Sequence, residues 1–129
     1  MIRTALFVGT FIVLQGCALH SYIPSFWDDN QAKKIIDVRQ LVENIDCGRP
    51  HAPQARAIKD DLQWFDLYSE SKGMMQNDVR ALIRPLQETN EDFLKRSLEK
   101  EGSRAYCDGK KKVMQAQAFK AAQGVLDRW

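Results

Sequence analysis

Apolar residues recur at steps of three and four in four separate segments between residues 28 and 129. This spacing places them on one face of an α-helix, whereas a half-buried β-strand needs strict alternation, which no segment shows. The sequence therefore predicts an all-α fold. The four apolar faces are expected to comprise Ile35, Val38, Val42 and Ile45; Ala55, Ile58, Leu62, Phe65 and Tyr68; Val79, Leu82, Ile83, Leu86, Phe93, Leu94 and Leu98; and Met114, Ala118, Ala121, Ala122, Val125, Leu126 and Trp129.

Residues that start or stop helices separate these faces. Ser, Asp and Asn side chains accept hydrogen bonds at a helix start, Pro fits the first turn, and Gly ends helices. Residues 25–28 have the form of a capping box, and Asn30 offers a second start for the first helix. The other expected boundaries are Gly48 and Pro50 after the first helix, Pro53 and Gly73 around the second, and Asn77, Asp78 and Gly102 around the third.

Pro85 lies inside the third predicted helix. Because proline lacks a backbone donor and crowds the preceding turn, this helix must be kinked or split at Pro85. We favour the kink; after a split, Thr89 and Asp92 would cap the second piece. Residues 107–109 are predicted either to form a turn before the last helix or to begin that helix. Short connections between the helices predict an up-down bundle of about four helices.

The N-terminus has the order of a secretory signal. Arg3 supplies a positive start, residues 4–14 are mostly apolar, and Gly16 provides a small residue before Cys17. The apolar run is too short for a membrane-spanning helix, which needs about 20 residues. The sequence therefore predicts export through a membrane.

The four residues 14–17, Leu-Gln-Gly-Cys, resemble the processing site of bacterial lipoproteins. In that class an aliphatic residue and two small residues precede the cysteine; Leu14, Gly16 and Cys17 match, whereas Gln15 departs from the pattern. The resemblance covers residues 1–17. It implies that Cys17 receives a diacylglyceryl group, becomes the mature N-terminus and anchors the chain in membrane lipid. An uncleaved N-terminal membrane helix and an ordinary secretory signal remain as alternatives.

On this interpretation the chain has three parts. Residues 1–16 are the signal peptide, residues 17–27 the lipidated cysteine and a tether, and residues 28–129 the helical domain. In lipoproteins of this class, an aspartate after the cysteine retains the protein at the inner membrane. Ala18 stands at that position, so the resemblance implies the periplasmic face of the outer membrane.

The other two cysteines, Cys47 and Cys107, are left as a pair once Cys17 carries lipid. An even number of cysteines in an oxidising compartment favours a disulfide bond. In an up-down bundle, the end of the first helix and the start of the fourth lie at the same end, which is where these two residues fall. The bundle and the disulfide are therefore mutually consistent predictions.

Composition narrows the function classes. The formal net charge is +2, and residues 1–16 contribute only Arg3 to it, so the mature chain is nearly neutral. Nucleic-acid binding, which needs a marked basic excess, is not expected. The chain contains no nucleophilic serine motif and no glycine-rich phosphate loop. Its acidic pairs, Asp60 with Asp61 and Glu88 with Glu91 and Asp92, are typical of solvated helix surfaces, so we expect neither enzymatic activity nor a cofactor.

Two further groups of side chains are candidate sites. A metal site built from Cys47, His51, Cys107 and His20 matches no strong zinc spacing and competes with the disulfide for the same thiols, so no metal is expected. The run Lys110, Lys111 and Lys112 is a candidate patch for an anionic partner, although such runs usually form a solvated face.

The anchor also orients the predicted bundle. The start of the first helix, the connection between the second and third helices, and the chain end should lie near the membrane. Trp is favoured at membrane interfaces, so this end is a candidate membrane contact, with capping of the bundle core as the alternative. Its expected members are Phe26, Trp27, Met74, Met75 and Trp129.

The sequence thus predicts a non-enzymatic envelope lipoprotein that binds a protein or cell-wall component; its oligomeric state stays open. Residues 23–30, Ile-Pro-Ser-Phe-Trp-Asp-Asp-Asn, resemble the start of small lipoproteins carried by tailed bacteriophages. That resemblance implies an alternative, action on the host envelope. Exclusion of later phages is favoured over lysis as an outer-membrane spanin subunit, because such subunits are often proline-rich and extended. A cell-wall enzyme is the remote alternative.

Overall fold

The computed structural model describes residues 27–128, and every regular element in this range is helical. The elements are α2 (Asp29–Glu43), α3 (His51–Ser71), the short 3₁₀ helix η2 (Met74–Gln76), α4 (Asn77–Glu99) and α5 (Arg104–Leu126). The predicted all-α fold with four helices is confirmed. The predicted signal peptide, the lipidation site Cys17, the residues Phe26 and Trp129, and His20 lie outside the described residues.

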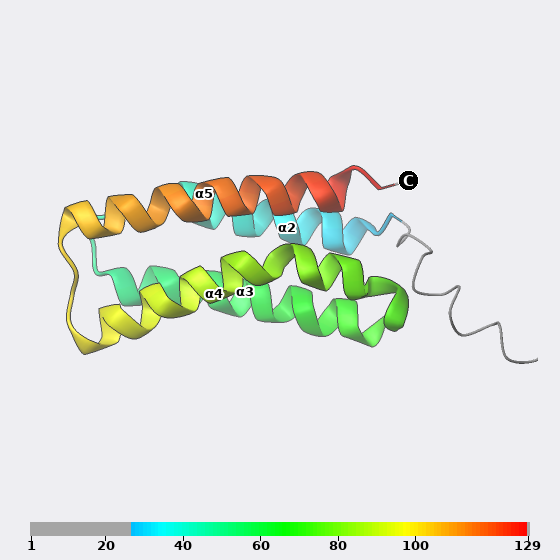
Figure 1. Ribbon diagram of the computed structural model, residues 1–129, viewed down its shortest axis with the longest axis horizontal. Helices are drawn as coiled ribbons and strands as arrows, with labels where there is room; N and C mark the ends of the chain where they lie inside the picture. The colour runs from blue at the N-terminus through cyan, green and yellow to red at the C-terminus, as the bar shows by residue number, and fades with distance from the viewer. Residues whose placement is uncertain (1–26, 129) are drawn as a thin grey trace, which may run out of the picture.

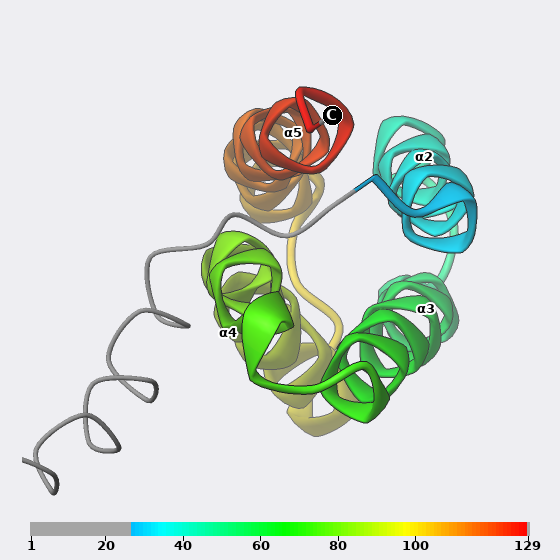
Figure 2. The same cartoon turned by 90° about the vertical axis from the view of Figure 1, so that its right-hand side faces the viewer.

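The four long helices form an up-down bundle. Figure 1 shows them side by side along the long axis, each running opposite to the one before it. Seen end-on, they occupy the corners of a square in chain order, so that α2 also lies beside α5 (Figure 2). This arrangement is the one expected when short loops join consecutive helices.

The predicted apolar faces meet in one core. Ile35, Val38 and Val42 of α2 are completely buried, and so are the central members of the other three faces, among them Phe65 and Phe93. Burial of such a face, rather than intrinsic helix propensity, supplies most of the stability of helices of this length. The core therefore explains why the four segments fold together.

Leu98 and Tyr68 depart from the predicted burial. Leu98 is 59% exposed. Tyr68 is half-buried, and its hydroxyl group donates a hydrogen bond to the carboxylate of Asp28 at 3.1 Å. An amphipathic tyrosine at the edge of an apolar face can bury its ring while its hydroxyl group finds a polar partner.

Two predicted helix starts are wrong. The cap of α2 is Asp28, whose carboxylate accepts hydrogen bonds from the backbone N–H groups of Asn30 and Gln31, both at 3.0 Å. Neither the box at residues 25–28 nor Asn30 as a cap describes this start. Helix α3 begins at His51, before Pro53. Pro53 still fits, because N–H groups in the first turn have no acceptor within the helix.

The two open questions about α4 and α5 are resolved. Helix α4 runs unbroken through Pro85, so the split at this residue is wrong. Pro85 and Ala81, whose carbonyl group loses its partner to the proline, are both exposed, so water can satisfy that carbonyl. Residues 107–109 belong to α5, which Ser103 caps by accepting a hydrogen bond from the backbone N–H of Tyr106 at 3.1 Å.

The predicted disulfide joins Cys47 to Cys107, with a Cα–Cα distance of 5.6 Å. Cys47 follows α2 and Cys107 lies in the first turns of α5, at the end of the bundle opposite to the start of α2. The bond therefore ties the first and last helices together where the topology predicted.

Candidate functional site

The described residues of the predicted membrane-proximal end lie together. The start of α2, the η2 connection and the end of α5 share one end of the bundle (Figure 1). Trp27 is 44% exposed and Met74 is 66% exposed, whereas Met75 is half-buried. Gly73, with a φ of 96°, makes the turn that brings Met74 there, a conformation that favours glycine. Two large apolar side chains are thus presented to the surroundings at this end.

Asp28 organises the same end. Besides capping α2, its carboxylate accepts hydrogen bonds from the Tyr68 hydroxyl group and the Lys72 ammonium group, both on the returning chain. Burial raises the pKa of Asp28, but the hydrogen bonds from Lys72, the Gln31 backbone and Tyr68 outweigh it, and the pKa lies below the usual value. The charged form of Asp28 therefore stabilises the folded chain.

A buried polar cluster lies behind this end. The side-chain amide of Gln31 donates hydrogen bonds to the Ser69 hydroxyl group at 2.9 Å and to the Gln76 amide oxygen at 2.8 Å. All three residues are buried. The cluster connects α2, α3 and η2, so it fixes how these elements meet rather than offering a reactive group to solvent.

The lysines at residues 110–112 do not share one face. Lys110 forms an ion pair with Asp92 at 2.6 Å, and Lys111 donates a hydrogen bond to the backbone oxygen of Ile45 at 2.8 Å. Lys112 is exposed. Hydrogen bonds from Lys110 and Arg96 lower the pKa of Asp92. Because the Lys110 ammonium group is engaged with α4 and that of Lys111 with the loop after α2, the predicted anionic-partner patch is not a continuous surface.

His51 occupies a structural position beside the disulfide. It is buried, its Nδ1 lies 2.7 Å from Oε1 of Glu101, and its Nε2 lies 3.3 Å from the backbone oxygen of Cys47. Glu101 also accepts a hydrogen bond from the backbone N–H of His51 at 3.0 Å, which satisfies a free donor at the start of α3. Between residues 27 and 128, no three potential metal-ligating side chains come together.

Three acids of the predicted pairs form ion pairs: Asp61 with Lys34 at 3.0 Å, Asp92 with Lys110 and Arg96, and Glu91 with Lys59 at 3.8 Å. Glu88 and Glu91 also line a hollow between α3 and α4. This hollow was not anticipated from the sequence.

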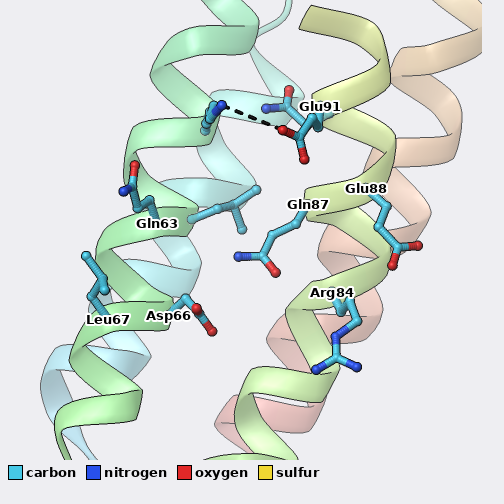
Figure 3. A pocket seen from close by; sticks show the side chains of 10 residues that line it. Gln63, Asp66, Leu67, Arg84, Gln87, Glu88 and Glu91 are labelled. Atoms are coloured by element: carbon cyan, nitrogen blue, oxygen red, sulfur yellow. Dashed lines mark ion pairs between the residues drawn. The ribbon is translucent and has the colours of Figure 1, made fainter. Parts of the chain in front are cut away.

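The hollow between α3 and α4, which we call the α3–α4 groove, has a volume of about 420 Å³. Gln63 and Leu67 line it from α3, and Gln87 extends from α4 toward α3 (Figure 3). Leu67 is 55% exposed. The complete lining is Lys59, Leu62, Gln63, Asp66, Leu67, Arg84, Gln87, Glu88, Asn90 and Glu91.

The charges of the groove are unevenly paired. Lys59 and Glu91 face each other across it at 3.8 Å, and Arg80 holds Asp66 through two contacts at 2.8 and 3.2 Å. The side chain of Arg84 forms no hydrogen bond or ion pair with any other residue in the range 27–128, and the same holds for the side chain of Glu88. The groove therefore contains one guanidinium group without a partner, that of Arg84. Two of its three acids are paired, Asp66 with Arg80 and Glu91 with Lys59.

Asn90 adds a buried polar atom. The residue is only 1% exposed, and its side-chain N–H group donates a hydrogen bond to the backbone oxygen of Ala55 at 2.8 Å. Its side-chain oxygen has no hydrogen-bond partner within the described part of the chain. A buried acceptor without a donor is costly, and native proteins have few of them.

A second hollow of about 380 Å³ continues along the same two helices. It shares Lys59 and Glu91 with the α3–α4 groove and contains the exposed Leu98. The Lys59–Glu91 ion pair therefore marks the border between the two hollows.

No protein-family model, curated protein or solved structure matches this chain. Among the helices of residues 27–128, none has the length and apolar character needed to cross a bilayer.

Proposed function

We propose that the chain is a lipid-anchored protein of the bacterial envelope, whose helical domain binds another envelope component without catalysing a reaction. The observation that carries the proposal is the use of the three cysteines. Cys17 stands at the lipoprotein-like processing site, and the remaining two, Cys47 and Cys107, are bonded to each other. Such a bond suits an exported protein, because the cytosol keeps thiols reduced.

The geometry supports this assignment in a second way. Helix α2 begins at Asp29, shortly after Cys17, so the anchor would approach the bundle at the end that exposes Trp27 and Met74. Apolar and aromatic side chains at that end suit the interface of a bilayer. The long axis of the bundle would then carry the disulfide end away from the membrane. Ala18 favours the periplasmic face of the outer membrane.

The test is the intact mass of the protein recovered from bacterial membranes, measured with and without reductant. We expect a chain that starts at Cys17, carries acyl groups and gains two hydrogens on reduction of one disulfide. Cys17→Ala is the matched control, because it removes the acceptor of the lipid and keeps the other two cysteines. A mass that starts at Met1 without acyl groups would overturn the proposal.

The resemblance of residues 23–30 to phage lipoproteins supports a second candidate, action on the envelope of an infected host. It shares the anchor and the compartment, so the mass measurement does not separate it from the first. Expression of the chain in a phage-sensitive host does: loss of phage adsorption supports exclusion, and envelope rupture that needs an inner-membrane partner supports lysis.

A further inference from the structure

We propose that one end of the bundle docks onto the surface of a zwitterionic lipid bilayer, with Trp27 and Met74 at the boundary between headgroups and acyl chains. This end, which we call the η2 end, comprises the start of α2, the η2 connection and the end of α5 (Figure 1). The inference rests on the proposed function for the lipid anchor at Cys17. It adds a second membrane contact, which the folded domain makes with its own side chains.

The apolar side chains of the η2 end face outward. Trp27 is 44% exposed and Met74 is 66% exposed. Side chains that capped the bundle core would be buried, so capping does not account for these two. Tryptophan is favoured at bilayer interfaces because its ring is apolar while its N–H group needs a polar partner. The N–H group of Trp27 donates a hydrogen bond to the carboxylate of Asp29 at 2.6 Å.

Asp28 holds the two parts of the η2 end together. Its carboxylate caps α2, one residue after Trp27, and accepts a hydrogen bond from Lys72, two residues before Met74. The backbone that carries each apolar side chain is therefore fixed in the folded domain. A binding surface that is already ordered loses less conformational entropy on contact than one that the contact must order.

The proposed anchor keeps the η2 end close to lipid. Ten residues, from Cys17 to Phe26, precede Trp27, and a chain of this length spans at most about 35 Å. A short link between two binding groups gives an effective concentration of about millimolar. A contact through two apolar side chains, too weak to hold a free domain on a membrane, is therefore populated in the anchored one. The disulfide end lies farther away by the length of the 23-residue helix α4, about 35 Å.

Charge selects the kind of lipid. The helix termini at the η2 end carry more acids than cations, namely Asp28, Asp29, Asp78 and Asp127 against Lys72 and Arg128. Each cation is paired with one of the acids, Lys72 with Asp28 and Arg128 with Asp78. The remaining negative charge repels anionic headgroups and is compatible with the ammonium group of a zwitterionic lipid. A zwitterionic bilayer is therefore the partner that fits this end.

Trp64 provides an internal comparison. It is 42% exposed, almost the same as Trp27, but it lies on the side of the bundle, in α3. Its ring stacks on that of Tyr68, with 4.9 Å between the centroids, and the ammonium group of Lys34 lies 5.2 Å from it. The ring of Trp64 thus has partners within the fold, and we expect it to stay clear of lipid.

The experiment measures tryptophan fluorescence in the acylated chain, reconstituted into vesicles of phosphatidylethanolamine and phosphatidylcholine. The phosphatidylcholine carries bromine, which quenches tryptophan on contact, in its acyl chains near the headgroup. Trp64→Phe/Trp129→Phe leaves Trp27 as the fluorophore, and Trp27→Phe/Trp129→Phe leaves Trp64. We expect bromine to reduce the emission of Trp27 and to leave that of Trp64 unchanged. Replacing part of the phosphatidylethanolamine by phosphatidylglycerol should make the loss smaller.

Met74→Asp should restore emission from Trp27 in the brominated vesicles, because a charged side chain is costly among acyl chains. Leu67→Asp is the matched control. Leu67 is an apolar residue of similar exposure, 55%, but it lies on the side of the bundle, in α3. This substitution should leave the quenching of Trp27 unchanged.

Four results would overturn the inference: no effect of bromine on Trp27, a loss for Trp64 that equals or exceeds that for Trp27, a loss that Met74→Asp leaves unchanged, and a loss that grows with phosphatidylglycerol. A loss for Trp64 alone would mean that the domain lies on its α3 side. Each result is obtained on chain whose acylation the intact mass has verified, so it leaves the proposed anchor standing. Chain recovered without acyl groups would overturn the proposed function as well.

Discussion

Removing the disulfide should weaken the fold by a large and calculable amount. The bond joins residues that are 60 positions apart, so it closes most of the helical domain into a loop. In the chain-entropy model a loop of this length restricts the unfolded chain by an amount equivalent to about 4 kcal/mol. Small domains have free energies of unfolding of about 5–15 kcal/mol. The double variant Cys47→Ala/Cys107→Ala should therefore lose a quarter or more of the stability of the domain.

The assay is guanidinium unfolding followed by far-ultraviolet circular dichroism, together with the thermal midpoint. A loss of about 4 kcal/mol corresponds to a fall in Tm of roughly 15–30 °C for a domain of this size. Reduction of the unmodified chain should give a similar loss, since it breaks the same bond. Cys17→Ala, which leaves the disulfide intact, should unfold like the unmodified chain.

A loss below about 1 kcal/mol would refute the reasoning in one of two ways. Either the bond does not form in the native protein, or the unfolded chain retains enough structure to be insensitive to the link. Comparing the unmodified chain with and without reductant separates these cases. Without a bond, reductant changes nothing, whereas with an insensitive unfolded state it releases two thiols at little cost in stability.

Further predictions concern Asp28 at the start of α2 and the glycines of α5. Asp28→Asn keeps a good helix cap but loses the charge that binds Lys72, so it should cost about 1 kcal/mol at pH 7. Because folding lowers the pKa of Asp28 below the usual 3.8, this contribution is fully present above that pH and is lost as pH falls through the folded value; the difference between the two proteins in urea unfolding should therefore shrink as the pH is lowered below 3.8. Gly109→Ala should raise the free energy of unfolding by roughly 0.5–1 kcal/mol, since a Cβ there meets no atom within 4 Å. Gly124→Ala should give no such gain in the same assay, since its Cβ would lie 2.6 Å from Cδ1 of Leu82.

The helices and their core could be predicted because both depend on local spacing. The apolar faces that contain Ile35, Ile58, Ile83 and Met114 are buried, as the spacing of apolar residues at three and four positions predicts. Helix starts were less predictable, because several residues near the start of α2 can cap a helix. Asp28 alone caps it from the right distance, and its contact with the distant Lys72 was invisible in the local sequence.

The run of three lysines shows that neighbours in the sequence need not form one surface. Residues 110–112 are adjacent in sequence, but successive residues of an α-helix point about 100° apart. Lys110 therefore reaches α4, whereas Lys111 reaches the loop after α2, so residues that are adjacent in the chain do not form one surface.

The α3–α4 groove could not be predicted because it depends on how two helices are rotated against each other. Gln63 and Gln87 are separated by a whole loop and the short η2 helix, and no sequence pattern relates them. Asn90 was the one available signal: it falls between Leu86 and Phe93 on the buried face of α4, where an apolar residue is expected. A polar residue in a core position indicates a bonding role, although not which partner it has.

The two ends of the bundle are held by different means, and this bears on the groove. At one end the disulfide ties the C-terminal side of α2 to α5, whereas at the opposite end Asp28 joins the start of α2 to the end of α3. Neither link joins α3 to α4, whose mutual position is set by their buried faces, by the η2 connection and by polar contacts such as Arg80 with Asp66 and Asn90 with Ala55. The geometry of the groove therefore depends on contacts between α3 and α4 and not on the disulfide. Breaking the disulfide should lower the stability of the domain while leaving the groove intact in the molecules that remain folded.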